Sequence, residues 1–388
     1  MFYLNFVYRG LGYDGLALGA LVGAQALGVV LGAVPAATVA RGRSRRTVIL
    51  TGGVIFAAGL TGIVLLDAFP LLFASTTLLG IGGILASSSG AALLADATSA
   101  SARSTRFGQN IALGTMAGFL ASALAGLLAE PVALLLRTTT GDVTVLRVLV
   151  GGGGIIAAAS AIPIFFIRSA PVTGTTLEPT QRYGLLARFL TTEFVFGLGA
   201  GSFIPFTNLF FAERFGVPFA TLGVMLGAIA AAGSLGALAH GIFARRFGAV
   251  PSVVGVVLGS IPFALLAAFT NDLALALGAL ALRAFLMYGS AATWNALTFS
   301  SFTPRERAGV NAVAALAWNG GAGIGSVISG GVRGAVGTSG YSLNLLTLVV
   351  FYAMAALLIL AFFRRHEPRG DIGMSDEPLR REERILQP

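Results

Sequence analysis

Long apolar runs occupy most of this chain and constrain its fold more than any other feature. Eleven of them lie at residues 16–40, 47–66, 70–95, 109–129, 146–167, 185–211, 217–244, 250–270, 273–299, 310–332 and 342–363. An α-helix needs roughly 20 residues to cross the hydrocarbon core of a bilayer. In that core the backbone polar groups must be satisfied within the segment, which favours helices. The pattern therefore predicts an all-α, polytopic membrane protein.

The charge content excludes an ordinary soluble protein. Only 11% of the 388 residues are charged and 56% are hydrophobic, whereas a soluble domain carries about 25% charged residues. The chain has no cysteine and two histidines, which leaves no disulfide framework and little material for a metal site. It also lacks a Walker loop, which disfavours ATP-driven transport. We expect neither a cofactor nor a catalytic activity.

The arginines orient the predicted helices in the membrane. All 25 basic residues are arginine and produce the net charge of +9. With the segment around residues 41–46 in the cytoplasm and strict alternation, 19 arginines lie inside and five outside. This bias follows the positive-inside rule. It predicts a multi-pass protein of the cell (inner or plasma) membrane with a cytoplasmic C-terminus. The basic loops then face membrane lipid rather than nucleic acid.

The polar segment "RSAPVTGTTLEPTQR" (168–182) lies near the middle of the chain and indicates a linker between two halves. The predicted domains are an N-terminal helix bundle at 1–167, a cytoplasmic linker at 168–184 and a C-terminal helix bundle at 185–363. The remaining residues, 364–388, are rich in charge and proline, a composition typical of a disordered tail.

An internal repeat supports this division. "RGLGYDGLALGALVG" (9–23) matches "ERFGVPFATLGVMLG" (213–227), and further matches join 37–46 to 241–250 and 106–110 to 307–311. At the first offset Met1 corresponds to Pro205, so about 20 residues of the second repeat's first helix have no counterpart. We expect two pseudo-symmetric six-helix bundles with the first helix mostly missing. The alternative is a true eleven-span protein.

These features resemble the major facilitator superfamily over about residues 1–365. The family's loop signature is Gly-x-x-x-Asp-Arg-x-Gly-Arg-Arg, and "ATVARGRSRR" (37–46) and "GIFARRFG" (241–248) keep its basic residues. Both copies carry arginine, Arg41 and Arg245, in place of the acid that helps latch the family's cytoplasmic gate in the outward-open state. The resemblance implies a monomeric secondary transporter for a small-molecule solute.

The resemblance also implies candidate residues for a cytoplasmic gate. They are Arg41, Arg45, Arg46, Asp96, Arg106, Arg245, Arg246 and Arg307. Asp96 precedes a basic loop, as in many family members, and Arg307 in "FTPRERAGVNA" matches a basic residue of the equivalent loop. In "RAFLMYGSA" Arg283 resembles the arginine of the family's fourth-helix motif, here displaced into the tenth helix.

Two ionisable side chains lie well inside predicted spans, Glu193 and Arg283. An unpaired charge at the bilayer centre costs about 2.5–3.5 kcal/mol or more. Their depths differ by only a few Å at about 1.5 Å per residue. The resemblance implies that the seventh and tenth helices of the fold lie beside a central cavity, so the two could meet. The functional hypothesis is that Glu193 carries a proton while Arg283 holds an anionic group. The alternatives are a structural ion pair between two helices and a Glu193 side chain that reaches toward the cytoplasm.

Residues three and four apart share a helix face, which groups Arg283 with Met287, Ser290 and Trp294. This stripe predicts the wall of a solute cavity, although helix packing also produces such stripes. Asn208 is a further binding candidate, as are Asn110 and Asn319; hydrogen bonding between helices is the alternative role.

The main interpretation is proton-coupled efflux of a small organic solute by alternating access. The absence of the family's Gly-Pro antiporter signature from "GTMAGFLASALAG" (114–126) weighs against efflux. The alternatives are an uptake symporter for an anionic or polar solute and a non-transporting membrane sensor of the same fold. A hydrolase using "ASSSG" (86–90) and His240 is disfavoured, because no oxyanion or metal group accompanies them.

Overall fold

The computed structural model describes residues 2–39, 44–98, 103–167, 180–303 and 306–364, and their regular elements are helices. Residues 2–167 are called the first half below, and residues 180–364 the second half. The helices of the first half are α1 (Leu4–Gly10), α2 (Gly15–Val39), α3 (Arg45–Leu65), α4 (Phe69–Asp96), α5 (Arg103–Leu136), α6 (Val143–Ala159) and α7 (Ile162–Phe166). Those of the second half are α8 (Tyr183–Phe203), η1 (Ile204–Phe206), α9 (Thr207–Phe215), α10 (Phe219–Phe247), α11 (Ala249–Phe269), α12 (Leu273–Ser300), α13 (Arg307–Val336), η2 (Gly337–Ser339) and α14 (Gly340–Phe363). The all-α prediction is confirmed.

Ten segments of the described residues are long and apolar enough to cross a membrane. One of them, Gly309–Phe363, contains both α13 and α14, and another, Tyr183–Phe215, contains α8, η1 and α9. The ten segments therefore account for the eleven predicted runs, and the prediction of a polytopic membrane protein is confirmed.

The run predicted at 109–129 is too short at both ends. Its helix, α5, begins at Arg103 and continues to Leu136, with Pro131 inside the helix. The apolar sequence Val-Ala-Leu-Leu-Leu that follows Pro131 extends the helix. As a result Glu130, which was placed beyond the span, lies within it.

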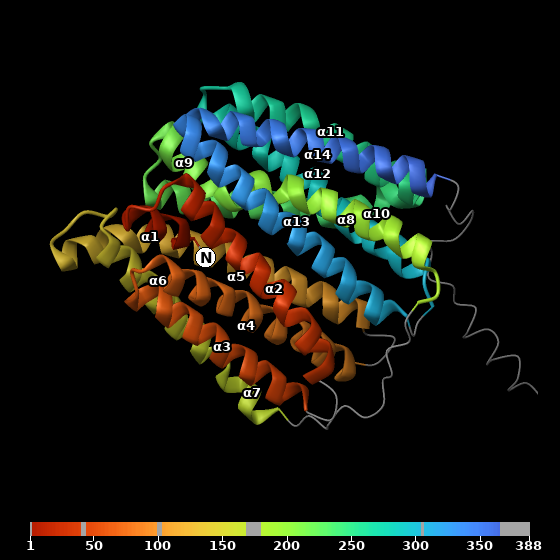
Figure 1. Ribbon diagram of the computed structural model, residues 1–388, viewed down its shortest axis with the longest axis horizontal. Helices are drawn as coiled ribbons and strands as arrows, with labels where there is room; N and C mark the ends of the chain where they lie inside the picture. The colour runs from red at the N-terminus through yellow and green to blue at the C-terminus, as the bar shows by residue number, and fades with distance from the viewer. Residues whose placement is uncertain (1, 40–43, 99–102, 168–179, 304–305, 365–388) are drawn as a thin grey trace, which may run out of the picture.

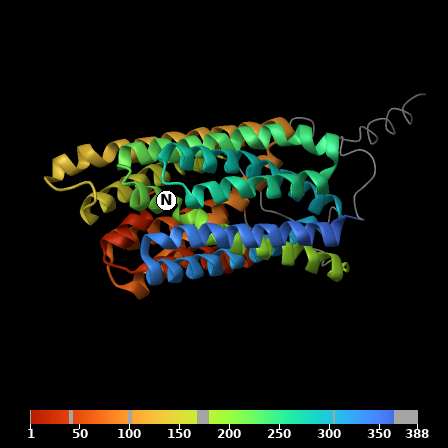
Figure 2. The ribbon, with the colours of Figure 1, turned by 90° about the horizontal axis from the view of Figure 1, so that it is seen from above.

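The long helices run roughly side by side along the length of the molecule (Figures 1 and 2). The short helices α1 and α9 contact each other at one end, called the seam end here. The opposite end, where α7 finishes and α8 begins, is called the linker end. Most of the predicted linker (168–184) lies outside the described residues, as does the predicted tail beyond Arg364.

The turns that follow α1 and α9 have the same backbone form. Gly12 has φ 85° and Gly216 has φ 65°, in the left-handed region that glycine adopts without a steric penalty. Each turn leads into a long helix, at Gly15 and at Phe219. The two glycines, and the two helix starts, are related by the same offset of 204 residues that aligns the sequence repeat. The repeat therefore extends to backbone conformation at the seam end.

Glycines bring the two halves into close contact along two helix pairs, α2 with α13 and α5 with α10. A Cβ added to Gly19 would lie 2.5 Å from the Ser326 carbonyl oxygen, and one added to Gly223 would lie 2.3 Å from that of Ser122. Not every Gly-x-x-x-Gly pair is used in this way. A Cβ on Gly114 or Gly118 would meet no described atom of another element within 4 Å.

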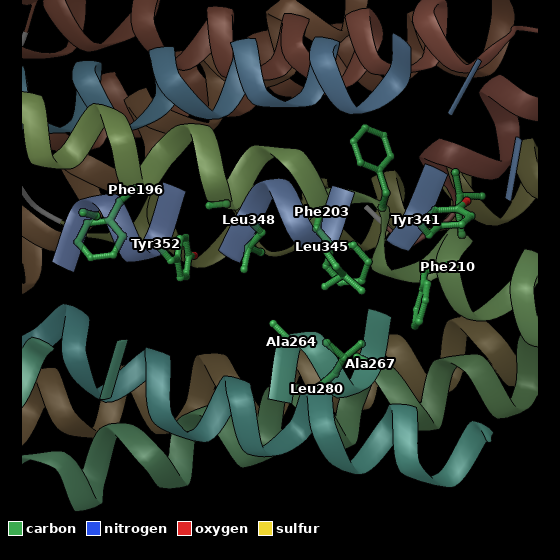
Figure 3. Close-up of a cluster of buried hydrophobic side chains, with 14 of the residues drawn as sticks. Phe196, Phe203, Phe210, Ala264, Ala267, Leu280, Tyr341, Leu345, Leu348 and Tyr352 are labelled. Carbon is green, nitrogen blue, oxygen red and sulfur yellow. The ribbon is translucent and has the colours of Figure 1, made fainter. Parts of the chain in front are cut away.

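The second half contains much of the buried aromatic core. Phe196 packs against Tyr352 and Phe210 packs against Tyr341 of α14, while Phe203 packs against Phe210, so that these rings form a stripe beside α14 (Figure 3). The aromatic rings meet mostly edge to face, with the centroids of Phe196 and Tyr352 5.4 Å apart, a geometry that the ring quadrupoles favour. This stripe holds α8, η1 and α9 against α14 and so positions the site described next.

Candidate solute-binding site

A cavity of about 500 Å³ opens within the second half. Its walls come from α8, α11, α12, α13 and α14, with one residue from η1. The lining residues are Glu193, Phe196, Ile204, Val253, Met287, Tyr288, Ser290, Ala291, Trp294, Asn295, Asn311, Ala314, Ala315, Trp318, Asn319 and Tyr352. A mostly apolar wall with a few polar groups is typical of small-molecule sites, and the volume is in their usual range.

Glu193 is the acidic residue of this lining. The indole Nε1–H of Trp294 donates a hydrogen bond of 2.7 Å to Glu193 Oε1. Trp294 itself is buried, and its ring packs against Phe189 and Phe363. Because those contacts hold the indole in place, the carboxylate has a defined position at the cavity wall, where it can accept a further hydrogen bond or a proton.

Arg283 lies one helical turn before Met287 on α12 and is 6% exposed. Its guanidinium carbon is 5.2 Å from the ring centroid of Tyr352, a cavity residue. Arg283 is not part of the cavity lining, and it forms no ion pair with Glu193. Its Nε and Nη2 atoms have no hydrogen-bond partner among the described residues. Glu193 and Arg283, the two charged residues singled out from the sequence, therefore lie near one cavity without contacting each other.

The predicted stripe on α12 largely coincides with the cavity wall. Met287, Ser290 and Trp294 line it, together with their neighbours Tyr288 and Asn295. The Ser290 hydroxyl donates to the Met287 carbonyl oxygen at 2.7 Å, which leaves the two lone pairs of the Ser290 oxygen as acceptors.

Asn208 lies elsewhere, between α1 and α9 at the seam end. Its Nδ2 donates to the Phe2 carbonyl oxygen at 2.9 Å, and its Oδ1 accepts from Asn5 Nδ2 at 2.9 Å. Of the other asparagine candidates, Asn319 lines the cavity and donates to the Ala315 carbonyl oxygen, whereas Asn110 is exposed.

Several lining residues were not predicted from the sequence. Asn295, Asn311, Trp318, Tyr352 and Phe196 all contact the cavity. The asparagines carried a usable signal, since an amide inside an apolar run is costly to bury unless it is hydrogen-bonded. The aromatic residues gave no signal in the sequence, because aromatic side chains are as common in helix packing as in cavity walls.

The predicted cytoplasmic gate residues that the structure describes lie at the linker end. Arg46 stacks over the Phe165 ring at 5.8 Å, Arg246 stacks over Phe247 at 5.5 Å, and Arg106 Nη1 donates to Gln109 Oε1 at 3.1 Å. Arg45 is partly buried at the start of α3. Arg41 lies outside the described residues, as do the side chains of Asp96, Arg245 and Arg307.

An acid that was not predicted, Glu306, also lies at this end. Hydrogen bonds from the Thr180 side chain, and from the backbone N–H and hydroxyl of Thr303, lower the pKa of Glu306 to about 2. Arg182 Nη1 donates to the Ser301 carbonyl oxygen at 3.0 Å. These bonds attach the residues just before α8 to the connection between α12 and α13.

The described residues provide no support for hydrolytic or metal chemistry. The Ser88 hydroxyl donates to the Ile84 carbonyl oxygen of its own helix at 2.6 Å, and the side chain of His240 lies outside the described residues. No group of three His, Cys, Asp or Glu residues that could hold a metal ion occurs within the described part of the chain.

The chain is similar to known proteins both in sequence and in fold. The sequence model of the Major Facilitator Superfamily matches residues 189–379. No curated protein sequence matches the chain. Among solved structures, the chain is similar to a bacterial homologue of the human lysosomal transporter Spinster in an inward-facing, occupied conformation, with a TM-score of 0.73 and 18% identity over 95% of this chain and 97% of that one.

Two further structures share the fold. A point mutant of the nucleoside transporter NupG has a TM-score of 0.71 and 15% identity over 93% of this chain and 98% of that one. The human organic anion transporter TETRAN has a TM-score of 0.57 and 17% identity, over 92% and 88% of the respective chains. At these identities the likeness concerns the fold.

Proposed function

The chain belongs to the major facilitator superfamily, and from this premise we propose that it exports a small organic solute in exchange for protons. The solute binds in the cavity of the second half, and Glu193 is the residue that carries the proton. The observation on which the proposal rests is the position of Glu193, an acid on the wall of an otherwise mostly apolar cavity, bonded to the buried indole of Trp294.

The coupling follows from competition for one carboxylate. A solute with a cationic or hydrogen-bond-donating group binds best to ionised Glu193, and a proton removes that charge. Binding free energies are reciprocal, so each ligand lowers the affinity for the other. Such competition favours antiport, with proton entry driving solute exit. The aromatic rings of Trp294 and Trp318 suit a flat or cationic organic body.

The movement that we propose is alternating access between two helix bundles, residues 1–167 and 185–363, joined by the linker at 168–184. The seam end is closed by contacts between the halves, including Asn5 with Asn208. The arginine bias places the linker end and the C-terminus in the cytoplasm. On this reading the structure is closed to the outside, as in the Spinster homologue whose structure is described as inward-facing. The transporter works as a monomer in the cell membrane, with its basic loops near lipid headgroups.

The experiment uses purified protein in liposomes loaded with a pH-sensitive dye. Ethidium, an aromatic organic cation, is the probe solute. An ethidium gradient imposed across the vesicles is expected to drive proton movement in the opposite direction. Glu193→Gln removes this movement, and the matched control Glu130→Gln, at an exposed acid of α5, retains it. Proton movement that persists in Glu193→Gln, or disappears equally in Glu130→Gln, contradicts the assignment.

A second candidate function is proton-coupled uptake of an organic anion. The unpaired Nε and Nη2 atoms of buried Arg283 favour it, since two guanidinium N–H groups without acceptors attract a carboxylate or similar group. TETRAN, described as an organic anion transporter, has the same fold. An anion near Arg283 adds negative charge close to Glu193 and so favours its protonated form, which gives symport. Benzoate as the probe then moves protons in its own direction, whereas ethidium moves none.

A further inference from the structure

Glu213 of α9 is shared by groups from both halves at the seam end. Arg9 Nη1 of α1 bonds to Glu213 Oε1, which joins the first half to the second. Arg333 Nη2 of α13 lies 3.8 Å from the same oxygen, Oε1. The Tyr341 hydroxyl of α14 donates to the other oxygen, Oε2, at 2.8 Å. Two arginines therefore compete for one carboxylate oxygen, and they belong to different halves.

The two arginines differ in their surroundings. The side chain of Arg9 is 53% exposed, whereas that of Arg333 is 6% exposed and that of Glu213 is 11% exposed. Arg333 stacks between the rings of Phe206 and Tyr341, at 5.2 Å and 5.0 Å. Its Nη1 atom has no hydrogen-bond partner among the described residues. Arg333 is thus held next to the carboxylate by aromatic stacking, at ion-pair distance but beyond hydrogen-bond distance.

From this geometry we propose that Glu213 is a partner-exchange latch. It bonds to Arg9 when the halves are closed at the seam end, and it passes to Arg333 of its own half when they separate. Arg9 leaves with α1, while Glu213, Arg333 and Tyr341 all belong to the second half. A charge-assisted hydrogen bond is about 2.7–2.9 Å long, so Arg333 needs to approach by only about 1 Å. Because the carboxylate always keeps a cationic partner, opening avoids the penalty of a poorly solvated, unpaired charge.

The exchange predicts opposite effects for the two arginines. Removing Arg9 weakens only the closed arrangement and favours opening. Removing Arg333 takes away the partner that receives Glu213, and so favours closure. A simple set of stabilising ion pairs predicts instead that only the Arg9 substitution favours opening, and that the Arg333 substitution leaves the distribution unchanged, because Arg333 and Glu213 belong to the same half. The proposal rests on the alternation between two arrangements given under Proposed function, but its test requires no transport.

The chain is suited to the measurement because it contains no cysteine. Thr139 and Thr338 are exposed, lie at the seam end, and belong to different halves. Spin labels on Thr139→Cys and Thr338→Cys report the distance between the halves in the full chain, reconstituted in lipid. In the parent protein the short-distance population corresponds to the closed seam.

Arg9→Gln is expected to raise the ratio of open to closed population roughly two- to fivefold, the range for an ion pair that is half open to water. Arg333→Gln is expected to lower it. Arg147→Gln is the control: its partner, Asp67, is 2.6 Å away in the same half, so the distribution stays unchanged. If Arg333→Gln does not fold, Arg333→Met replaces it, since methionine keeps a flexible side chain between the two rings but removes the charge that receives Glu213.

Two outcomes overturn the latch. One is an Arg9→Gln distribution that matches Arg147→Gln. The other is a distribution in the Arg333 variant that is unchanged or shifted toward opening. Failure of ethidium or benzoate transport with the expected distance shifts leaves the latch intact and rejects the proposed function alone.

Discussion

The close contact between α2 and α13 makes Gly330→Ala an informative perturbation. A Cβ at residue 330 would lie 2.2 Å from the Gly15 carbonyl oxygen and 2.8 Å from the Gly19 Cα. Both are backbone atoms of α2, in the other half, and cannot move away as a flexible side chain would. The helices must therefore part by roughly 1 Å at this point, in an interior packed as tightly as an organic crystal.

The magnitude follows from the cost of overpacking, typically about 1–3 kcal/mol per added group. Since Gly330 contacts the opposite half, this cost applies to the closed arrangement and is relieved when the halves separate at the seam end. The population ratio should shift toward the open arrangement by about 5- to 150-fold. The spin-label pair at Thr139 and Thr338 measures that shift directly.

Gly114→Ala is the matched control, because its Cβ would meet no described atom of another element within 4 Å. It should leave the distance distribution unchanged. Gly201→Ala is a second control, since its Cβ would lie 2.0 Å from the Ala322 carbonyl oxygen within the second half. It should lower the thermal stability without favouring the open arrangement. A Gly330→Ala distribution identical to that of Gly114→Ala would refute the reasoning.

Three further predictions concern single groups. Glu306→Gln should lower the melting temperature at pH 7, because the pKa of Glu306 is lowered to about 2 in the folded protein. The stabilisation by Glu306 is present above the unfolded pKa of about 4.3 and is lost as the pH falls toward 2. Melting curves from pH 7 to pH 2 should therefore show the difference from the parent protein disappear, and a constant difference contradicts the assignment. Trp294→Phe removes the donor to Glu193 and should slow solute-driven proton movement about 10- to 150-fold, as expected for a hydrogen bond to a charged group worth about 1.5–3 kcal/mol. Unchanged rates in the liposome assay would mean that the bond has no part in coupling. Gly216→Ala should destabilise the protein by about 1–2 kcal/mol because φ is 65° there, and chemical unfolding equal to that of the parent would exclude strain at this turn.

Part of the candidate site could be predicted from local spacing. Met287, Ser290 and Trp294 were grouped because residues three and four apart share a helix face, and all three line the cavity. Glu193 was selected because an acid inside an apolar run is costly, and it lies on the same wall. The roles assigned to these residues stay predictions until transport is measured.

Other placements could not be predicted in this way. The expected meeting of Glu193 with Arg283 rested on similar depths and on the helix placement that the resemblance implies, but neither determines the rotation of each helix about its axis. Asn208 follows a break in the helix, where η1 (Ile204–Phe206) contains Pro205, a residue without a backbone N–H. The break separates α8 from α9, and Asn208 bonds at the α1–α9 seam rather than in the cavity.

The helices, their approximate ends and the repeat could be predicted from the amino-acid sequence, because these depend on the length of apolar runs and on neighbours along the chain. Which side chains meet could be seen only in the folded molecule. Arg9 and Glu213, which occupy equivalent positions 204 residues apart, contact each other, while Glu193 bonds to Trp294 and Arg283 stacks on Tyr352. These pairings depend on the rotation and separation of packed helices. Backbone contacts at glycines such as Gly19 and Gly330 set that geometry, and no local pattern specifies it.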